Sequence, residues 1–275
     1  VVVSTHTIHL QEQLLHKDIP FLRSVLPFEF SAVLVKGRSN YISLRRLGVA
    51  ANRADATLSR LEDFNQLAEI QLWANRTDDG SRSDLNFKPA PNVWDLVQSD
   101  HGNCLGKQCK TYNRCFYYQA RRRIWSANLL IVNHALFMSD LAVRDAGGTL
   151  LPEYDLAIFD EAHTLEGVAA EHLGLRVANT QVDYLLSRLY NERTQKGLLI
   201  YHRLPEAVRQ LQATRTAAED FFARVVAWQG QDGAANGRLR RKLPIADTLG
   251  DELRRLAAAI GRGAEEIEAE EERVE

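Results

Sequence analysis

Short apolar runs that alternate with helical patterns are the feature that most constrains how this chain folds. Each run is long enough for one buried strand, and polar or helix-forming residues follow it. The runs are VVVST (residues 1–5), SAVLVKG (31–37), LLIVNH (129–134) and LAIFDEAH (156–163). Strand–helix units with nearly continuous apolar strands predict a parallel sheet that helices cover on both faces. We therefore expect an α/β fold for this part of the chain.

The C-terminal third has a different pattern, which predicts helices alone. After about residue 179, apolar residues recur at steps of three and four, as is typical of amphipathic helices. One stripe runs from Val208 to Val225 and a second from Ile245 to Ile260. A basic segment with several glycines (228–244) is predicted to be a loop between them. Residues 74–103, rich in Asn, Asp, Ser, Gly and Pro, are also predicted to form loops.

Three cysteines lie in a polar stretch, HGNCLGKQCKTYNRCFYY, with the spacing C-x4-C-x5-C. Free cysteines are usually buried among apolar residues, so Cys104, Cys109 and Cys115 are better explained as ligands of an iron–sulfur cluster or of zinc. The spacing differs from the C-x2-C pairs of common zinc sites and favours the cluster. A four-iron cluster needs four ligands. His101 is a candidate for the fourth, although a solvated loop histidine explains it as well, and unligated thiols are another alternative.

The last apolar run ends in charged residues at the point where its strand should stop. Asp160, Glu161 and His163 follow four mostly apolar residues. One explanation is a helix that starts with acidic residues, which the helix dipole favours. The other explanation is a site that holds magnesium and a water molecule for nucleotide hydrolysis.

Composition argues against several classes of protein. The chain has 275 residues, of which 45% are hydrophobic and 25% are charged, as in ordinary globular proteins. Its net charge of −2 provides no overall basic field, so any contact with nucleic acid must be local. No apolar run approaches the roughly 20 residues that cross a bilayer. Three cysteines, an odd number, argue against a secreted disulfide framework, and we expect a reducing compartment such as the cytoplasm.

Together these segments resemble the DinG-type and XPD-like helicases, an iron–sulfur branch of the superfamily-two (DEAH) DNA helicases. The similar segments occur in the family's order. VVSTHTIHLQEQL resembles the DNA-contacting motif after the ATP-binding loop, and VKGRSNYISLRRL resembles the entrance to the iron–sulfur domain. YYQARRRIWSANLLIVNHALF resembles the exit from that domain, and LAIFDEAH resembles the Walker B motif. The resemblance covers about residues 1–177, and the helical remainder resembles the family's arch domain only in position.

The resemblance implies a domain organisation. Residues 1–43 and 116–177 would form part of a RecA-like motor domain of the P-loop type, residues 44–115 a mostly helical iron–sulfur insertion, and residues 178–275 part of an all-helical arch domain. The phosphate-binding loop and the second motor domain of the family have no counterpart: no G-x-x-x-x-G-K-[ST] occurs, and GNCLGKQ is one residue short. We therefore expect a portion of a longer protein that hydrolyses no ATP by itself.

The resemblance also implies roles for the residues at the end of LAIFDEAH. Asp160 would hold Mg²⁺–ATP through water, because magnesium keeps most of its water ligands. Glu161 would orient or deprotonate the water that attacks the γ-phosphate, and His163 would couple the nucleotide state to the DNA-binding motifs. The family repeats Asn133 and His134 at the neighbouring strand end, either as structural ties or as part of this coupling.

One departure from the family concerns the cluster. The family usually has its first cluster cysteine where this chain has Ser43. A hydroxyl is a poor iron ligand beside a thiolate. Three alternatives therefore stay open: an incomplete or labile 4Fe-4S cluster on three cysteines, a cluster that takes Ser43 or His101 as its fourth ligand, or no cluster.

Several polar and basic residues are expected to contact single-stranded DNA. Ser4, Thr5 and His6 end the first strand, where hydroxyls and a helix N-terminus suit phosphates. Alternatively, Thr5 only caps the helix. Basic residues near tyrosines flank the entrance and exit of the insertion, and such groups suit the phosphates and bases of a single strand. These basic residues are Lys36, Arg38, Arg45 and Arg121.

The predicted function is part of an ATP-dependent DNA helicase. By resemblance it would move 5′ to 3′ on single-stranded DNA and unwind duplex junctions in repair or recombination. One alternative is a single-strand DNA-binding module that hydrolyses no ATP. A second is the helicase portion of an exonuclease–helicase fusion, and a third is a zinc-stabilised structural domain.

Overall fold

The computed structural model describes residues 1–232, 243–265 and 267. The chain forms two compact units. The first consists of Val1–Gly48 and Gln66–Arg176, and the second of Val49–Asn65 and Val177–Glu275. Most of the loop predicted at 228–244 lies outside the described residues. In the part of the chain that the structure describes, no helix combines the length and the hydrophobicity needed to cross a membrane.

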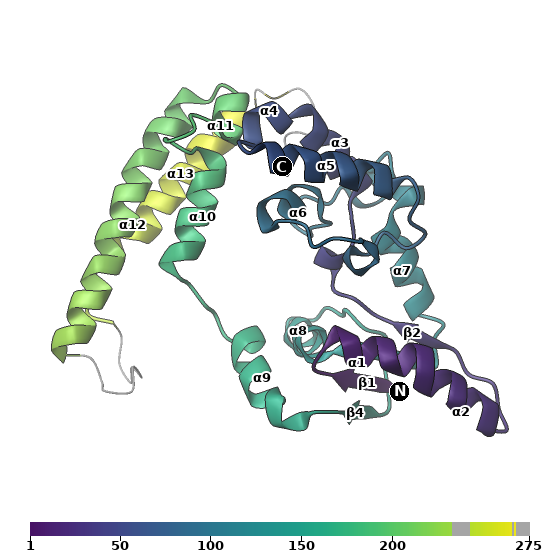
Figure 1. Cartoon of the computed structure of the whole chain (residues 1–275). Helices are drawn as coiled ribbons and strands as arrows, with labels where there is room; N and C mark the ends of the chain where they lie inside the picture. The colour runs from purple at the N-terminus through teal and green to yellow at the C-terminus, as the bar shows by residue number, and fades with distance from the viewer. Residues whose placement is uncertain (233–242, 266, 268–275) are drawn as a thin grey trace. The chain divides into compact units, whose positions relative to one another are not determined.

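A four-stranded parallel sheet forms the centre of the first unit (Figure 1). Its strands are β1 (Val2–Thr5), β2 (Ala32–Leu34), β3 (Leu129–Asn133) and β4 (Ala157–Phe159), in the order β2-β3-β1-β4. Ser4 of β1 is paired with Val132 on one side and with Phe159 on the other. The predicted parallel sheet is confirmed, and each apolar run contributes one strand. Because the strands are parallel, the carboxyl ends of β1, β3 and β4 meet at one edge.

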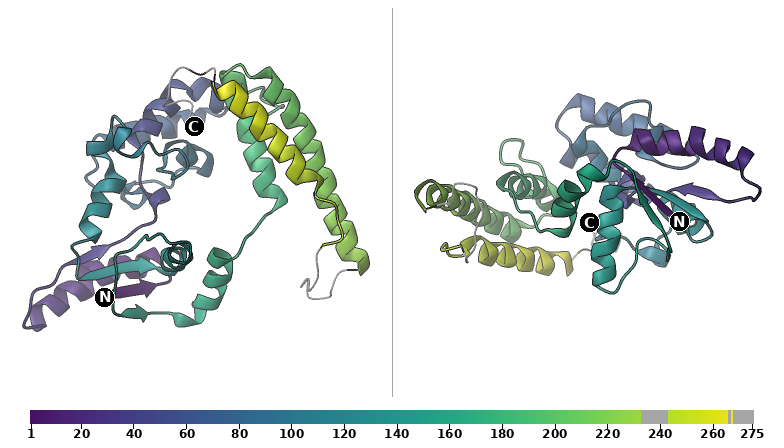
Figure 2. Two further views of the ribbon diagram at one scale, coloured as in Figure 1. Left: turned by 180° about the vertical axis from the view of Figure 1, so that it is seen from behind. Right: turned by 90° about the horizontal axis from the view of Figure 1, so that it is seen from below.

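Helices connect the strands. Helix α1 begins after Thr7, whose hydroxyl accepts a hydrogen bond from the Leu10 amide at 3.3 Å. One π-helical turn, Leu14–Asp18, joins α1 to α2, and Figure 2 shows both helices in purple beside the sheet. The helices that lie wholly or partly in this unit are α1 (Ile8–Gln13), α2 (Ile19–Val25), α3 (Leu44–Asn52), α5 (Leu61–Ala74), α6 (Pro91–Val97), α7 (Phe116–Ile124), α8 (His134–Asp145) and α9 (Leu165–Leu173).

Helix α6 corrects the sequence prediction, which assigned residues 74–103 to loops. Pro91 lies in its first turn, where the missing N–H of proline leaves no hydrogen bond unmade. Val93 and Trp94 are at most 2% exposed, and the Trp94 indole donates a hydrogen bond to the Ser39 carbonyl at 2.8 Å. The polar residues around α6 suggested a loop, whereas the apolar side of this short helix is buried.

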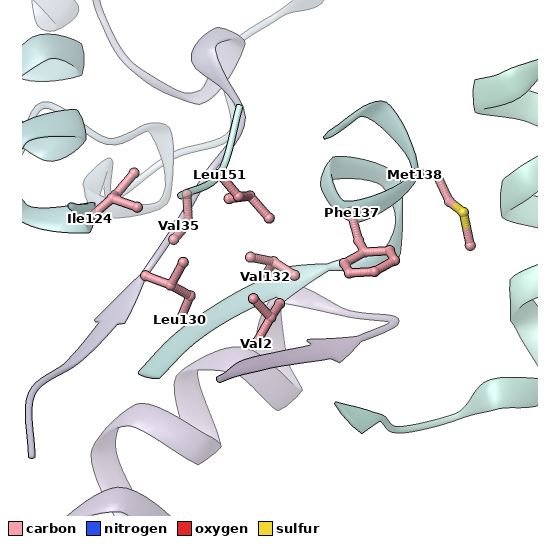
Figure 3. Packing of buried hydrophobic residues seen from close by; sticks show 8 residues of the cluster. All are labelled: Val2, Val35, Ile124, Leu130, Val132, Phe137, Met138 and Leu151. Atoms are coloured by element: carbon pink, nitrogen blue, oxygen red, sulfur yellow. The ribbon is translucent and has the colours of Figure 1, made fainter. Parts of the chain in front are cut away.

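A cluster of buried side chains packs the sheet against α8 (Figure 3). Its members are Val2, Val35, Ile124, Leu130, Val132, Phe137, Met138 and Leu151. The ring of Phe137 on α8 also meets the ring of Phe159 on β4 edge-to-face, with centroids 4.9 Å apart. Burial of one side chain of this size stabilises a fold by about 1.5–3 kcal/mol. The cluster therefore fixes the strands whose ends form the carboxyl edge.

Strand β4 is less buried than the sequence predicted. It lies at one side of the described sheet and pairs only with β1. Ile158 is 47% exposed and Leu156, just before the strand, is 53% exposed. Successive side chains of a strand point to opposite faces, so Phe159 packs on the cluster while Ile158 points away from it. An apolar run alone does not show which of its residues a neighbour covers.

The second unit is helical, as predicted. Its helices are α4 (Ala54–Thr57), α10 (Asn179–Leu189), α11 (Leu198–Tyr201), α12 (Pro205–Asp232) and α13 (Thr248–Glu265). Helices α12 and α13 pack along each other, and Leu211 and Leu256 from the two predicted stripes are 0% and 3% exposed at their contact.

Residues 49–65 belong to this helical unit, although the sequence prediction placed them in the insertion. The Lys196 ammonium donates a hydrogen bond to the Leu58 carbonyl at 2.6 Å, and the Gly197 amide donates one to the Ala56 carbonyl at 3.1 Å. The three predicted domains, with boundaries after residues 43, 115 and 177, stay a prediction.

The buried carboxylate of Asp140 leads to a prediction about stability. It is 0% exposed and accepts hydrogen bonds from the amides of Leu150 (2.7 Å) and Leu151 (2.8 Å) and from Arg144 Nε (2.6 Å). Asp140→Ala leaves these donors without their acceptor, so we expect the free energy of unfolding to fall by at least about 3 kcal/mol. Urea denaturation followed by circular dichroism measures this change. The exposed Asp145→Ala, in the same helix, should stay within about 0.5 kcal/mol, and similar losses in both variants would contradict the prediction.

Candidate functional sites

Polar residues from three strands meet at the carboxyl edge of the sheet. Ser4 lies near the end of β1, His134 directly follows β3, and Asp160 directly follows β4. The Ser4 carbonyl accepts a hydrogen bond from the Asp160 amide at 2.9 Å, and Ser4 Oγ lies 2.6 Å from His134 Nδ1. Ligands of open parallel sheets bind outside this edge. Asp160 is therefore held at a ligand-binding position.

Asp160, Glu161 and His163 are exposed at this edge. Asp160 Oδ1 accepts the Glu161 amide at 3.0 Å, and Glu161 Oε2 lies 3.4 Å from His163 Nδ1. The φ angle of Glu161 is 55°, a left-handed conformation that costs energy and is often found at functional sites. A 3₁₀ turn (Ala162–Thr164) follows Glu161 and leads directly into α9, which begins at Leu165. Asp160 and Glu161 therefore also lie just before a helical segment, so the acidic helix start stays an alternative explanation.

Asn133 and His134 tie strand ends to their surroundings. Asn133 Oδ1 accepts the Leu136 amide at 2.8 Å and caps α8. His134 is 1% exposed and contacts Ser4 through Nδ1. Burial lowers the pKa of His134, while the backbone of Asp160 and Glu161 acts in the opposite direction. The ring therefore lies next to the acidic loop.

Ser4 and Thr5 have internal partners. Both are 0% exposed, and Thr5 Oγ1 donates a hydrogen bond to the Thr7 carbonyl at 3.3 Å. The capping residue of α1 is Thr7, so the alternative assignment of the cap to Thr5 is wrong by two residues. His6 is exposed. DNA contact stays a prediction for Ser4, Thr5 and His6. Of these, only the exposed His6 could contact DNA without a change in the structure.

The predicted DNA-binding cations beside the insertion also bind protein groups. The Lys36 ammonium donates hydrogen bonds to the hydroxyls of Ser81 and Ser83, both at 2.7 Å. Arg121 donates one to the Leu150 carbonyl. Both cations tie separate segments of the first unit together.

Arg45 and Arg38 hold the loop that contains the cysteines. Arg45 is 7% exposed and donates a hydrogen bond to the Asn103 carbonyl at 2.8 Å. Arg38 donates one to the Asp100 carbonyl at 2.8 Å, and its guanidinium lies 4.0 Å from the centre of the Tyr117 ring. Basic residues near tyrosines, which predicted DNA contact in the sequence, form internal ties in the structure.

The three cysteines and Ser43 line one small cavity in the insertion. Its volume is about 30 Å³, and His101 is not among the residues that line it. Cys104 Sγ accepts the Gly106 amide at 3.4 Å and lies 3.8 Å from Tyr118 Oη. The fold therefore brings together the three predicted thiol ligands and one of the two predicted fourth ligands.

The thiols around this cavity differ in acidity. Burial raises the pKa of Cys104, but hydrogen bonds from the Arg38 guanidinium and the Gly106 amide outweigh burial, so the pKa lies below its usual value. The pKa of Cys115 is raised, chiefly by burial and further by Cys104 and Cys109. The influence of each thiol on the others reflects how close together the three lie.

The donor set suits a thiolate-bound metal centre in its chemistry. Among the described residues, however, no group of three or more His, Cys, Asp and Glu side chains is placed to hold a metal ion. An iron–sulfur cluster holds its ligand sulfurs further apart than one ion does, and the cavity of about 30 Å³ would have to widen to admit it.

Comparisons with known proteins agree with this arrangement. Residues 74–182 match the family model DEAD_2. The ATP-dependent DNA helicase YoaA of Escherichia coli (strain K12) is 37% identical over 185 residues, which cover 66% of this chain and 29% of that protein. The ATP-dependent helicase DinG of Mycobacterium tuberculosis (strain H37Rv) is 35% identical over 181 residues, 60% of this chain and 27% of that protein. The chain is a relative of the DinG-type helicases.

A third relative aligns with more of this chain. The 3'-5' exonuclease DinG of Bacillus subtilis (strain 168) is 30% identical over 233 residues, which cover 83% of this chain and 23% of that protein. The chain thus spans less than a third of the length of these relatives. The DEAD_2 match includes the three cysteines, His134 and the loop from Asp160 to His163.

Sequence reasoning missed two contacts of the candidate sites. It did not pair Ser4 with His134, and it did not place Arg38 beside Cys104. Each pair joins residues far apart in the chain, so no local spacing could have shown it. The only signals were polar residues at the ends of two predicted strands and a basic residue before the cysteine segment.

The opposite pKa shifts of Cys104 and Cys115 predict different reactivity in the metal-free protein. The thiolate is the nucleophile, so alkylation by iodoacetamide should reach its half-maximal rate at lower pH for Cys104 than for Cys115, across roughly pH 6 to 10. Mass spectrometry of tryptic peptides measures both profiles. Arg38→Gln should move only the Cys104 profile to higher pH. Superimposable profiles in the unsubstituted protein would show that the prediction is wrong.

Proposed function

We propose that this DinG-type chain is part of an ATP-dependent DNA helicase. The observation that carries the proposal is the position of Asp160 and Glu161, two exposed carboxylates at the carboxyl edge of a parallel sheet. The names of the E. coli and M. tuberculosis relatives support it. ATP hydrolysis would drive translocation on single-stranded DNA and unwinding of duplex junctions. We expect movement 5′ to 3′ and a role in repair or recombination.

The carboxylates divide the work of hydrolysis between them. Asp160, held by the Ser4 carbonyl, would bind the Mg²⁺ of Mg–ATP through water. Glu161 would orient the attacking water, since phosphoryl transfer depends mainly on positioning and charge stabilisation. In the structure Glu161 faces His163 at 3.4 Å. Nucleotide binding would have to turn this carboxylate toward the water, and His163 would sense that movement.

The cysteine cavity is proposed to hold an iron–sulfur cluster. Cys104, Cys109 and Cys115 would be its thiolate ligands, and Ser43, which also lines the cavity, would be the fourth side chain. When bound, the cluster would cross-link the cysteine loop to the start of α3 and so stabilise the insertion. The lowered pKa of Cys104 favours the thiolate form that metal binding requires.

DNA contact is proposed for residues that are free to reach it. His6 is exposed at the carboxyl edge, and Arg122 and Arg123 are exposed on α7. Exposed cations can neutralise phosphates, whatever the base sequence. Lys36 and Arg45 make internal hydrogen bonds, through which they would also support such a surface.

A second candidate function is the helicase portion of an exonuclease–helicase fusion. The observation that favours it is the B. subtilis relative, named a 3'-5' exonuclease, whose alignment covers 83% of this chain. Degradation of a labelled single strand by the full-length gene product would support the fusion. Strand separation without degradation would support a helicase alone.

Glu161→Gln tests the proposed role of this chain in the full-length gene product. The substitution keeps the size of the side chain and removes its charge, so DNA-stimulated ATP hydrolysis should fall by about 10²–10⁴-fold while ATP binding persists. Phosphate release and equilibrium nucleotide binding measure the two effects. Glu166→Gln, in the first turn of α9, is the matched control and should hydrolyse ATP normally. Undiminished hydrolysis in Glu161→Gln would contradict the role, and DNA affinity without any nucleotide affinity would favour a non-hydrolysing binding module.

Ser43→Cys tests the cavity as a cluster site. A fourth thiolate is a better iron ligand than a hydroxyl, so the variant should retain more iron and sulfide per chain and lose its visible absorbance more slowly in air. Anaerobic purification followed by absorbance spectra and iron, sulfide and zinc counts provides the measurement. His101→Ala should match the unsubstituted protein. If the unsubstituted protein and the Ser43→Cys variant are both colourless and metal-free, the cluster is contradicted, and loss of iron in His101→Ala would identify His101 as the ligand instead.

A further inference from the structure

His134 is buried with one ring nitrogen unpaired. The side chain is 1% exposed, and Nδ1 lies 2.6 Å from Ser4 Oγ. Nε2 is also buried and has no hydrogen-bond partner in the part of the chain that the structure describes. A buried polar atom without a partner costs about 1–3 kcal/mol, so an atom of this kind needs an explanation.

The ring lies between the ends of β1 and β4. Its centroid is 6.1 Å from that of His6, which follows β1, and 6.2 Å from that of Phe159, which ends β4. The backbone of Asp160 and Glu161 is close enough to influence its protonation. Ser4 contacts both partners, since its hydroxyl meets His134 and its carbonyl accepts the Asp160 amide.

The contact with Ser4 is compatible with either neutral tautomer of the ring. His134 is 1% exposed, and the uncharged imidazole that burial favours has a hydrogen on only one ring nitrogen. If the Ser4 hydroxyl donates to Nδ1, the hydrogen is on Nε2. Nε2–H is then a buried donor beside the backbone of the acidic loop, where the available acceptors are carbonyl oxygens.

The acidic loop has a reason to change its conformation. Glu161 is in the left-handed region, with a φ of 55°, and such strain costs about 1–3 kcal/mol. Its carboxylate lies 3.4 Å from His163 Nδ1. A change of the Glu161 backbone out of the left-handed region would relieve this strain and shift the carbonyls of the loop relative to the His134 ring.

We infer that His134 is a positioning residue for the loop from Asp160 to Glu161. In the nucleotide-bound arrangement its Nε2–H donates a hydrogen bond to a backbone carbonyl of that loop, while Ser4 holds the ring through Nδ1. The inference rests on the proposed function, because it concerns the loop that would bind Mg–ATP. His6 lies beside the same ring and is exposed, so His134 also joins the end of β1 to the acidic loop.

Two substitutions in the full-length gene product test the roles of the two ring nitrogens separately. His134→Asn places an amide near the position of Nδ1, where it can still bond Ser4, and has nothing at the position of Nε2. His134→Gln places an amide near the position of Nε2. We expect kcat for ATP hydrolysis to fall by about 10–100-fold in His134→Asn, as for other groups that orient a metal-binding side chain, and much less in His134→Gln. His172→Asn, an exposed histidine on α9, is the matched control.

Hydrogen–deuterium exchange provides a readout that does not depend on turnover. Mg²⁺ with a non-hydrolysable ATP analogue should slow amide exchange in residues 156–166 of the unsubstituted protein. The protection should persist in His134→Gln and disappear in His134→Asn, with KM for ATP and the melting temperature changed little in both. Loss of protection together with kcat supports the positioning role.

Two results would overturn the inference. One is unchanged kcat and protection in His134→Asn. The other is equal losses of kcat in both variants together with equal losses of melting temperature, which would show that the ring serves packing alone. Failure of the unsubstituted protein to hydrolyse ATP would contradict the proposed function itself, so the two failures can be told apart.

Discussion

The parallel pairing of β1 with β3 and β4 is the constraint on which the candidate nucleotide site depends. Parallel strands end at one edge, so residues far apart in the chain, Ser4, His134 and Asp160, become neighbours. Ser4 is the centre of this arrangement because its carbonyl holds the acidic loop and its hydroxyl holds the buried imidazole. Ser4, for which the resemblance predicts DNA contact, thus holds both partners of the candidate nucleotide site in place.

The segment around the cysteines is stabilised in a different way. This segment contains short 3₁₀ turns and few apolar residues. Hydrogen bonds must therefore supply much of the stability that a hydrophobic core supplies elsewhere. Arg38, Arg45 and Arg46 provide them by donating to backbone carbonyls of the segment from Asp95 to Asn103. An arginine has five donors and cannot lose its charge, which suits it to this role. These ties hold the segment that leads into the cysteine loop.

The sequence predicted the strands well because an apolar run is itself the cause of strand burial. It also predicted the acidic loop, since the end of a parallel strand determines where Asp160 lies. It could not show the internal partners of the cations, since Lys36 and Arg45 look the same in a sequence whether they bond to serine hydroxyls, to a carbonyl group or to DNA, and DNA contact stays a prediction for both. It failed for α6 because Pro91 and its polar neighbours suggest a loop, whereas buried Trp94 determines the structure. The sequence could not show that Ser43 lines the cysteine cavity and that His101 does not, and the fourth ligand stays a prediction.

Helix α7 connects the two candidate sites within the first unit. Cys115 caps its N-terminus beside the cavity, and Ile124 at its other end belongs to the core cluster under the sheet. Nine residues at about 1.5 Å each give a rigid connection of roughly 14 Å. Helix α7 thus has one end at the cysteine cavity and the other in the core cluster, to which Leu130 and Val132 of β3 also belong.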